Sequence, residues 1–242
     1  MTGKSHDALP RLESAGIDGW MVRLFEQIEE TNLPWITALA RHCQSEFGDA
    51  LVDLVPSYTT LLVVFDPFRL SPSEARQKLV RLLTDLEPDE TVGTGRVHEL
   101  PTFYDPSVGP DLARVAEQTG MTVDEVIACH SGKTYRVFAL GFAPGFAFMG
   151  LTDPRLECPR LDTPRKKVPV GSVAIAARQT AAYPTATPGG WNLLGRTSAS
   201  LFDREREGFS LLNVGDEVRF VSVSREQFEN QGGDTTPMEA KG

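Results

Sequence analysis

The sequence predicts an α+β protein with two domains, a ferredoxin-like split βαβ domain over residues 1–95 and a β-barrel over residues 96–242. Three observations predict this architecture. Helical periodicity alternates with short apolar runs in the first hundred residues. Residues 138–203 carry seven glycines and seven prolines in 66 positions, too closely spaced for an ordinary helix and typical of turns between short strands. A two-residue apolar alternation near the carboxy terminus indicates a closing barrel strand.

The first half of the amino-terminal domain contains a strand, a helix and a hairpin. Residues 20–25 form a short apolar run that predicts a strand. Residues 33–47 repeat apolar side chains at helical spacing before Gly48, which can end the helix. Residues 50–55 and 60–65 are apolar runs separated by a Pro-Ser-Tyr turn, which predicts two strands of a hairpin.

A second helix is predicted from Pro72 to Leu86, because Ser71 is a favourable N-cap and Glu74 stands at the capping-box spacing. Residues 96–101 are the next extended segment. The order β-α-β-β-α-β is that of a ferredoxin-like unit, so this segment is expected to be the fourth strand of a sheet with both helices on one face. The glycine-rich residues 92–96 predict a turn or hinge rather than a phosphate-binding loop.

The second domain is predicted to begin with two short helices, over residues 109–118 and 122–128, the latter opened by a Thr122–Glu125 capping box. A polar, frayed tail is expected from about Glu229. Barrel strands are predicted at residues 135–142 and 172–176, and residues 213–223 predict a turn followed by a closing strand.

Charge and composition restrict the classes of function. The chain has a net charge of −9, yet residues 138–203 hold seven Lys and Arg against four Asp and Glu, a local balance of +3. A basic, glycine-rich region inside an acidic protein favours a small anion such as a carboxylate or phosphate over nucleic acid. No apolar run is long enough for a membrane span, and the first residues lack the apolar core of a signal peptide.

The cysteines indicate a reducing compartment. Cys43, Cys129 and Cys158 are odd in number, far apart and without a CxxC motif, which argues against a disulfide framework and a zinc site. We therefore expect a cytoplasmic protein without a metal.

The turn-rich segment has two interpretations. Glycines and prolines at this spacing also occur where a barrel only turns corners. Polar and aromatic side chains nevertheless gather beside these turns, which favours a binding site on them. The side chains concerned are Arg165, Ser172, Gln179, Tyr183, Trp191 and Arg196.

The same segment resembles a known family. The matching pieces are GFAPGF (141–146), TPR (163–165), VPVGSVAIA (168–176), QT (179–180), YP (183–184) and PGGWNLLGRT (188–197). They are similar to the signature of the KipI family, also known as the B subunit of the bacterial ATP-dependent 5-oxoprolinase and formerly as allophanate hydrolase subunit 1. The resemblance implies a cyclophilin-like barrel.

The resemblance also implies a function. The expected role is to open 5-oxoproline, a small carboxylate, to glutamate. The expected partners are a KipA-like C subunit and an A subunit. The reaction would use ATP, and the ATP could be bound by the complex rather than by this chain. The chain is not expected to be active alone. The family offers an alternative, an inhibitor of a sensor histidine kinase, and a divergent paralogue without activity is a third possibility.

Three residues are candidates for chemistry. His130 can act as a general base, or it can cap the end of its helix. Tyr183 is held extended by Pro184 and can point its hydroxyl into a cleft, or it can be a core residue. Gln179 can bind a lactam or satisfy local backbone.

Further residues are candidates for binding the substrate or an anion. Arg165 and Arg196 can grip a carboxylate, and Trp191 is either a stacking wall or a core plug. We expect the proposed groups to share one hollow. The remaining candidates are Ser172, Gly145, Gly189 and Gly190.

Some patterns are missing or altered. The sequence has no GxSxG, HExxH, P-loop or amidase signature, so the chain by itself does not resemble a serine hydrolase, zinc hydrolase or P-loop ATPase. Ala147 and Phe148 replace a Pro-Tyr pair of the family, and Ala177 and Ala181 replace glycines. These alanines have either ordinary dihedral angles or a strain of about 1 kcal/mol or more.

Overall fold

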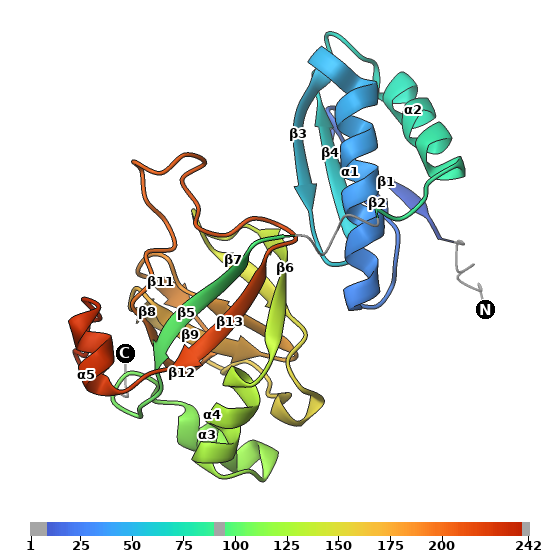
Figure 1. Ribbon diagram of the computed structural model, residues 1–242. Coiled ribbons are helices and arrows are strands. Elements are labelled where there is room, and N and C mark those ends of the chain that lie inside the picture. Colours follow the sequence, from blue (N-terminus) through green and yellow to red (C-terminus); the bar gives the residue numbers. More distant parts are fainter. Residues whose placement is uncertain (1–8, 90–94, 239–242) are drawn as a thin grey trace. The chain divides into compact units, whose positions relative to one another are not determined.

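The computed structural model describes residues 9–89 and 95–238 (Figure 1). The chain divides into two compact units, residues 1–93 and 94–242. The predicted domain boundary at residues 95 and 96 lies beside this division. The predicted turn or hinge at residues 92–96 lies mostly outside the described residues.

The amino-terminal unit is one antiparallel sheet in the order β1-β2-β4-β3 with two helices. Apolar side chains from both helices and from β2 and β4 form one core, so both helices cover the same face, as predicted. Its elements are β1 (Arg11–Ser14), β2 (Gly19–Arg23), α1 (Leu33–Phe47), β3 (Leu51–Pro56), β4 (Thr60–Phe65) and α2 (Pro72–Thr84), with single 3₁₀ turns at Glu30–Asn32 and Gly48–Ala50.

The local signals of this unit are confirmed. Helix α1 has the predicted bounds, and Gly48 follows it with a φ of +50°. Helix α2 begins with the predicted capping box, in which Ser71 accepts from the Glu74 backbone and Glu74 accepts from the Ser71 backbone at 3.0 Å. It ends at Thr84, one half turn before the predicted end at Leu86.

The predicted fourth strand of this sheet is wrong. Strand β1 pairs with β2 and takes that place, whereas β5 (Val97–Phe103), which contains most of the predicted segment, belongs to the barrel. The order of elements along the chain carries no information on which edge a strand joins. Leu12 of β1 packs against the core of the unit, which supplies the apolar contact for this edge.

The second unit contains the predicted closed barrel, with strand order β10-β7-β6-β13-β5-β12-β9. Strands β8 and β11 pair with each other beside it. Helix α4 begins with the predicted Thr122–Glu125 capping box. Its elements are α3 (Leu112–Thr119), α4 (Val123–Ser131), β6 (Thr134–Leu140), β7 (Ala147–Gly150), a 3₁₀ turn (Pro154–Leu156), β8 (Arg165–Val168), β9 (Ser172–Ala176), β10 (Gln179–Ala182), β11 (Thr187–Gly189), β12 (Asn192–Thr197), β13 (Glu217–Ser222) and α5 (Arg225–Asn230).

The carboxy-terminal segment differs from the predicted frayed tail. Helix α5 has its own capping box, formed by Ser224 and Gln227. Residues beyond it contact the barrel, because Met238 N donates to Ser107 O at 2.7 Å and the Met238 side chain packs against apolar side chains. The polar composition of this segment predicts a frayed tail and gives no sign of these few contacts with the barrel.

Two apolar clusters define the faces of the barrel wall. The inner cluster joins side chains from β5, β6, β7, β9, β10 and β13, including Val173 and Ala182. The outer cluster lies on the opposite face of β9 and β10 and includes Ala174, Ala181 and Tyr183. Side chains alternate between these faces along each strand. No helix in the described residues is long and apolar enough to cross a membrane.

Candidate functional site

Three neighbouring strands carry a row of polar side chains on the outer face of the barrel. Ser172 of β9 lies opposite Arg196 of β12 in the register, and Tyr183, which follows β10, donates its backbone N–H to Ser172 O at 2.9 Å. Opposite residues of an antiparallel pair share a face. We call Tyr183, Ser172 and Arg196 the polar row. All three side chains are buried.

Gly171 allows these strands to approach. It has a φ of +79°, and its N–H donates to Tyr183 O at 2.8 Å. A Cβ at this position would lie 2.5 Å from Thr197 O and 3.2 Å from the Arg196 side chain. Glycine is therefore required both by the dihedral angle and by the space.

Arg196 is held by a segment far along the chain. Its Nη1 atom donates to Asp234 O at 2.7 Å and Thr236 O at 3.1 Å, and lies 3.2 Å from Asp234 Oδ2. Burial lowers the pKa of Arg196, and the Asp234 carboxylate opposes that shift. The Nε atom of Arg196 and the Oγ atom of Ser172 are buried without a partner among the described residues.

Arg165 lies near the row on β8, opposite Gly189 of β11. Its Nη2 atom donates to Asp111 Oδ1 at 2.8 Å, and Asp111 Oδ2 accepts from Leu193 N at 2.7 Å. The Nη1 atom of Arg165 is buried and has no hydrogen-bond partner in the described part of the chain. The ion pair therefore fixes the guanidinium on one side, and Nη1 keeps a donor without an acceptor among the described residues.

The Tyr183 hydroxyl lies beside Gly189, where any Cβ would overlap it. Burial raises the pKa of Tyr183 to about 12, although the charges of Arg160 and Arg165 oppose that shift. The phenol is therefore protonated at neutral pH and has a proton that it can donate to a ligand. Arg165 lies opposite Gly189 in the register, and opposite residues share a face, so its side chain leaves β8 on the side where the Tyr183 hydroxyl lies.

Aromatic rings enclose this region. The Phe146 ring lies 5.2 Å from Tyr183 and 6.0 Å from Trp191, both edge to face. Trp191 is only 5% exposed, which favours the core plug over the stacking wall. The Arg160 guanidinium covers the Trp191 ring at 5.7 Å.

Two phenylalanines extend the cluster. Phe148, where the resemblance leads us to expect a tyrosine, lies 4.9 Å from Phe146 and packs against the apolar cluster without a hydroxyl. Phe142 is 63% exposed, has a φ of +69° and meets the Tyr183 ring edge at 6.5 Å. The cluster therefore reaches the surface at Phe142.

His130 lies inside the barrel and is fully buried. Its Nδ1 is 2.7 Å from the Tyr104 hydroxyl and its Nε2 is 2.8 Å from Thr180 Oγ1. Thr180 donates its only hydroxyl proton to Ala174 O at 3.1 Å, so it accepts from Nε2–H, and Tyr104 donates to Nδ1. Burial lowers the pKa of His130 to about 3. This geometry describes a neutral core histidine, and it favours neither of the two roles predicted for it.

The predicted residues thus do not share one hollow. Thr180 and Tyr183 are three positions apart, so their side chains lie on opposite faces, and the barrel wall separates His130 from the polar row. Gln179 is half-buried on the outer face but lies about 13 Å along the strand from Tyr183. The structure brings together Arg165, Ser172, Tyr183, Gly189, Trp191 and Arg196.

The other predicted glycines have packing roles. Gly145 has a φ of +79°, and a Cβ there would lie 2.8 Å from the Phe202 side chain and 2.9 Å from Leu201 O. Gly190 accepts from Leu161 N at 2.8 Å. Of the two alanines that replace glycines, Ala177 has a φ of +49° and is strained, whereas Ala181 lies in β10 without a positive φ.

Sequence reasoning missed Asp111, Tyr104 and Thr180. Thr180 belongs to the QT pair, but only its neighbour was selected. Asp111 stands at the start of a helix, where an acidic residue is ordinary. Its role depends on Arg165 and Leu193, which are distant in the sequence.

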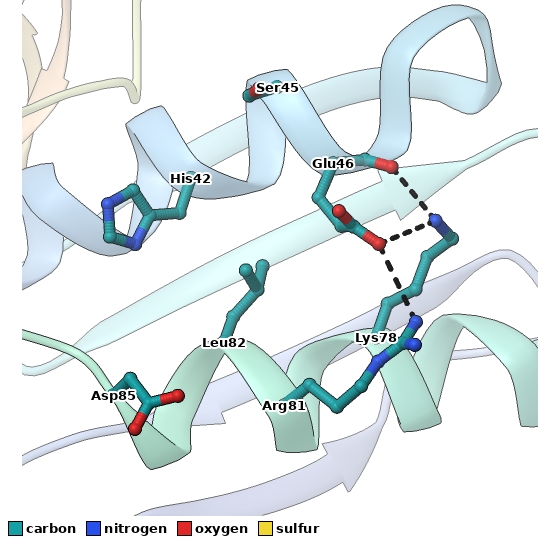
Figure 2. A pocket seen from close by; sticks show the side chains of 7 residues that line it. All are labelled: His42, Ser45, Glu46, Lys78, Arg81, Leu82 and Asp85. Atoms are coloured by element: carbon teal, nitrogen blue, oxygen red, sulfur yellow. Dashed lines mark hydrogen bonds and ion pairs between the residues drawn. The ribbon is translucent and has the colours of Figure 1, made fainter.

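A pocket of about 470 Å³ lies in the amino-terminal unit between α1 and α2 (Figure 2). Lys78 reaches from α2 to the main-chain oxygen and the carboxylate of Glu46, both at 2.9 Å, and Arg81 lies 3.5 Å from the same carboxylate. None of the predicted site residues lines this pocket. The described residues contain no group of His, Cys, Asp and Glu that could hold a metal ion.

Comparison with known proteins places these features in a family. The family described as carboxyltransferase domain, subdomain C and D, matches residues 10–212. The chain belongs to this family. The carboxyltransferase-domain match covers the amino-terminal unit as well as the signature segment.

Relatives within the family confirm the resemblance found in the sequence. The chain is 33% identical to the 5-oxoprolinase B subunit of Bacillus subtilis over 232 residues, covering 90% of this chain and 95% of the relative. It is 41% identical to the 5-oxoprolinase B subunit of Escherichia coli O157:H7 over 174 residues, covering 71% and 78%. The solved structure of TTHA0988 superposes with a TM-score of 0.74 at 39% identity, covering 86% of this chain and 40% of that longer chain.

Proposed function

We propose that this chain is the B subunit of an ATP-dependent 5-oxoprolinase and that Arg165 and Tyr183 bind the anionic substrate. The relatives that carry the name of the 5-oxoprolinase B subunit support this function over the kinase-inhibitor alternative. The observation that carries the site is the buried Nη1 atom of Arg165, which is oriented by Asp111 and has no partner among the described residues. A buried donor without a partner costs about 1–3 kcal/mol, which a ligand would recover.

Each group has a task suited to 5-oxoproline. Arg165 would donate a charge-assisted hydrogen bond to the substrate carboxylate. The protonated Tyr183 hydroxyl would donate a second hydrogen bond, and the rings of Phe146 and Trp191 would exclude water from the region. ATP is the co-substrate, and phosphorylation of the lactam oxygen would make the ring carbon a better electrophile.

The same residues support dependence on partner subunits. Tyr183 is protonated at neutral pH, and His130 is buried behind the barrel wall. Neither is placed to accept a proton from water at the polar row. The row therefore suits binding rather than the chemical step, which we assign to the complex with the C and A subunits.

The test is reconstitution of the complex. The chain would be copurified with the C and A subunits, and glutamate release would be measured with and without ATP and 5-oxoproline. The proposal expects release only when all three proteins and both small molecules are present. A well-folded complex that releases no glutamate would contradict it, and so would release by the other two proteins without this chain.

A further inference from the structure

The carboxy-terminal segment, residues 231–238, covers Arg196 and places the Asp234 carboxylate against its guanidinium. We call this segment the strap. Arg196 Nη1 bonds to two main-chain oxygens of the strap, at residues 234 and 236, and lies 3.2 Å from Asp234 Oδ2. An anionic ligand would place its oxygens against a guanidinium in the same way.

Two buried polar atoms of the β9–β12 strand pair have no hydrogen-bond partner in residues 9–89 and 95–238. Arg196 Nε and Ser172 Oγ stand on facing positions of β12 and β9, and both lack a hydrogen bond within the described ranges. Buried polar atoms in native proteins are normally paired, so an unpaired donor and an unpaired hydroxyl on opposite residues of one strand pair are the groups that a ligand would satisfy. A small anion supplies acceptors for both atoms.

The strap itself is weakly held. It has no regular secondary structure after α5, and the Asp234 side chain is 64% exposed. Its attachment to the barrel rests on the Arg196 contacts, on the hydrogen bonds from Ser198 Oγ to Gln231 Oε1 and from Met238 N to Ser107 O, and on the Met238 side chain. A segment with so few buried contacts opens locally at low free-energy cost.

We propose that Arg196 and Ser172 form a binding site for a small carboxylate or phosphate, and that the strap covers this site and competes with the ligand through Asp234. The inference deepens the proposed function and rests on it only for the choice of 5-oxoproline as a probe. Under this competition, the apparent association constant equals the intrinsic association constant multiplied by the fraction of molecules in which the strap is open. If the strap is open in about one molecule in ten, its release raises the affinity about tenfold.

The first test is calorimetric titration of the full-length chain without partners. The probes are 5-oxoproline, inorganic phosphate and the neutral lactam 2-pyrrolidinone. The release variant is Asp234→Ala combined with Met238→Ala, and the matched control is Glu226→Ala, which removes an exposed acid on α5. We expect the release variant to bind one of the two anions about tenfold more tightly than the wild type and the control, with 2-pyrrolidinone unchanged.

Further variants locate the site. Ser172→Ala in the release background is expected to lower the anion affinity several-fold, because the hydroxyl would bond to the ligand. Equal anion affinity of the wild type and the release variant would overturn the proposal. Absence of anion binding by a folded release variant would also overturn it. The anion that gains affinity distinguishes a carboxylate site from a phosphate site.

The second test measures the opening of the strap directly in the wild-type chain. Hydrogen exchange of the Thr236 and Met238 amides, which donate to Asp234 Oδ1 and Ser107 O, is expected to accelerate at a saturating concentration of the anion. Exchange in α5 is expected to stay constant. Slower or unchanged exchange of the strap with the anion bound would contradict competition. Both tests need no glutamate release, so their failure is distinct from failure of the proposed function.

Discussion

His130 Nε2 lies 2.8 Å from Thr180 Oγ1, on the face of β10 that points away from Tyr183. The relationship joins the end of α4 to the QT pair of the family signature, inside the barrel core. Thr180 therefore accepts a hydrogen bond from a buried imidazole inside the barrel, whereas Tyr183 lies on the outer face.

Because His130 is buried and neutral, stability should fall in acid. Its folded pKa is lowered to about 3 from 6.5, so the unfolded chain binds more protons between these values and the free energy of unfolding decreases as pH falls below 6.5. The loss is about 2 kcal/mol between pH 6.5 and 5 from this residue. Urea unfolding at both pH values, for the wild type and His130→Gln, measures it. Equal pH dependence in the two proteins would contradict a buried neutral imidazole.

Thr180→Val should destabilise the barrel without weakening substrate binding. The change removes the acceptor for His130 Nε2–H and the donor to Ala174 O, at a cost of about 1–3 kcal/mol. Thr180→Ser keeps the hydroxyl and should cost less. Denaturant midpoints give the stability, and titration with 5-oxoproline gives the affinity. A large loss of affinity in Thr180→Val at full stability would place the threonine in the binding site instead.

Gly189→Ala should weaken binding because a Cβ there overlaps the Tyr183 hydroxyl. Displacement of the phenol removes one donor, and we expect a loss of affinity of about tenfold. Gly141→Ala is the matched control, since a Cβ at Gly141 meets no atom within 4 Å. Equal 5-oxoproline affinity in both variants would show that the Tyr183 hydroxyl does not contact the ligand.

Ala177 and Ala181 should respond differently to substitution by glycine. Ala177→Gly relieves the positive φ, and this gain offsets the entropy that glycine adds to the unfolded chain. Ala181→Gly removes a fully buried methyl group from β10 and has no strain to relieve. We expect Ala177→Gly to be the more stable variant by about 1–2 kcal/mol in thermal or urea unfolding. The reverse order would contradict the strain at Ala177.

The parts of the fold that sequence predicted are those that local interactions decide. The capping boxes at Ser71 and Thr122 involve residues three positions apart, and the bounds of α1 follow from one amphipathic stripe. Strand β5 pairs with β13, some 120 residues away along the chain, as in the register of Glu99 with Arg219. No local pattern identifies such a partner, so its placement in the first sheet was wrong.

The candidate site was predicted only in part for the same reason. The family signature located Arg165, Tyr183 and Arg196, which the structure brings to one face. The burial of His130 depends on how the end of α4 packs against the barrel, and the local sequence does not determine that packing. The strap contact depends on residues 38 and 40 positions beyond Arg196, in a polar segment with no sequence signal.

The most direct test of the central claim is the steady-state kinetics of Arg165→Ala in the reconstituted complex, with the exposed Arg204→Ala as control. Loss of a charge-assisted hydrogen bond costs about 1.5–3 kcal/mol, so the KM for 5-oxoproline should rise roughly 10-fold to 100-fold with a smaller change in kcat. Arg204→Ala should match the wild type. An unchanged KM in a folded Arg165→Ala complex would contradict the account.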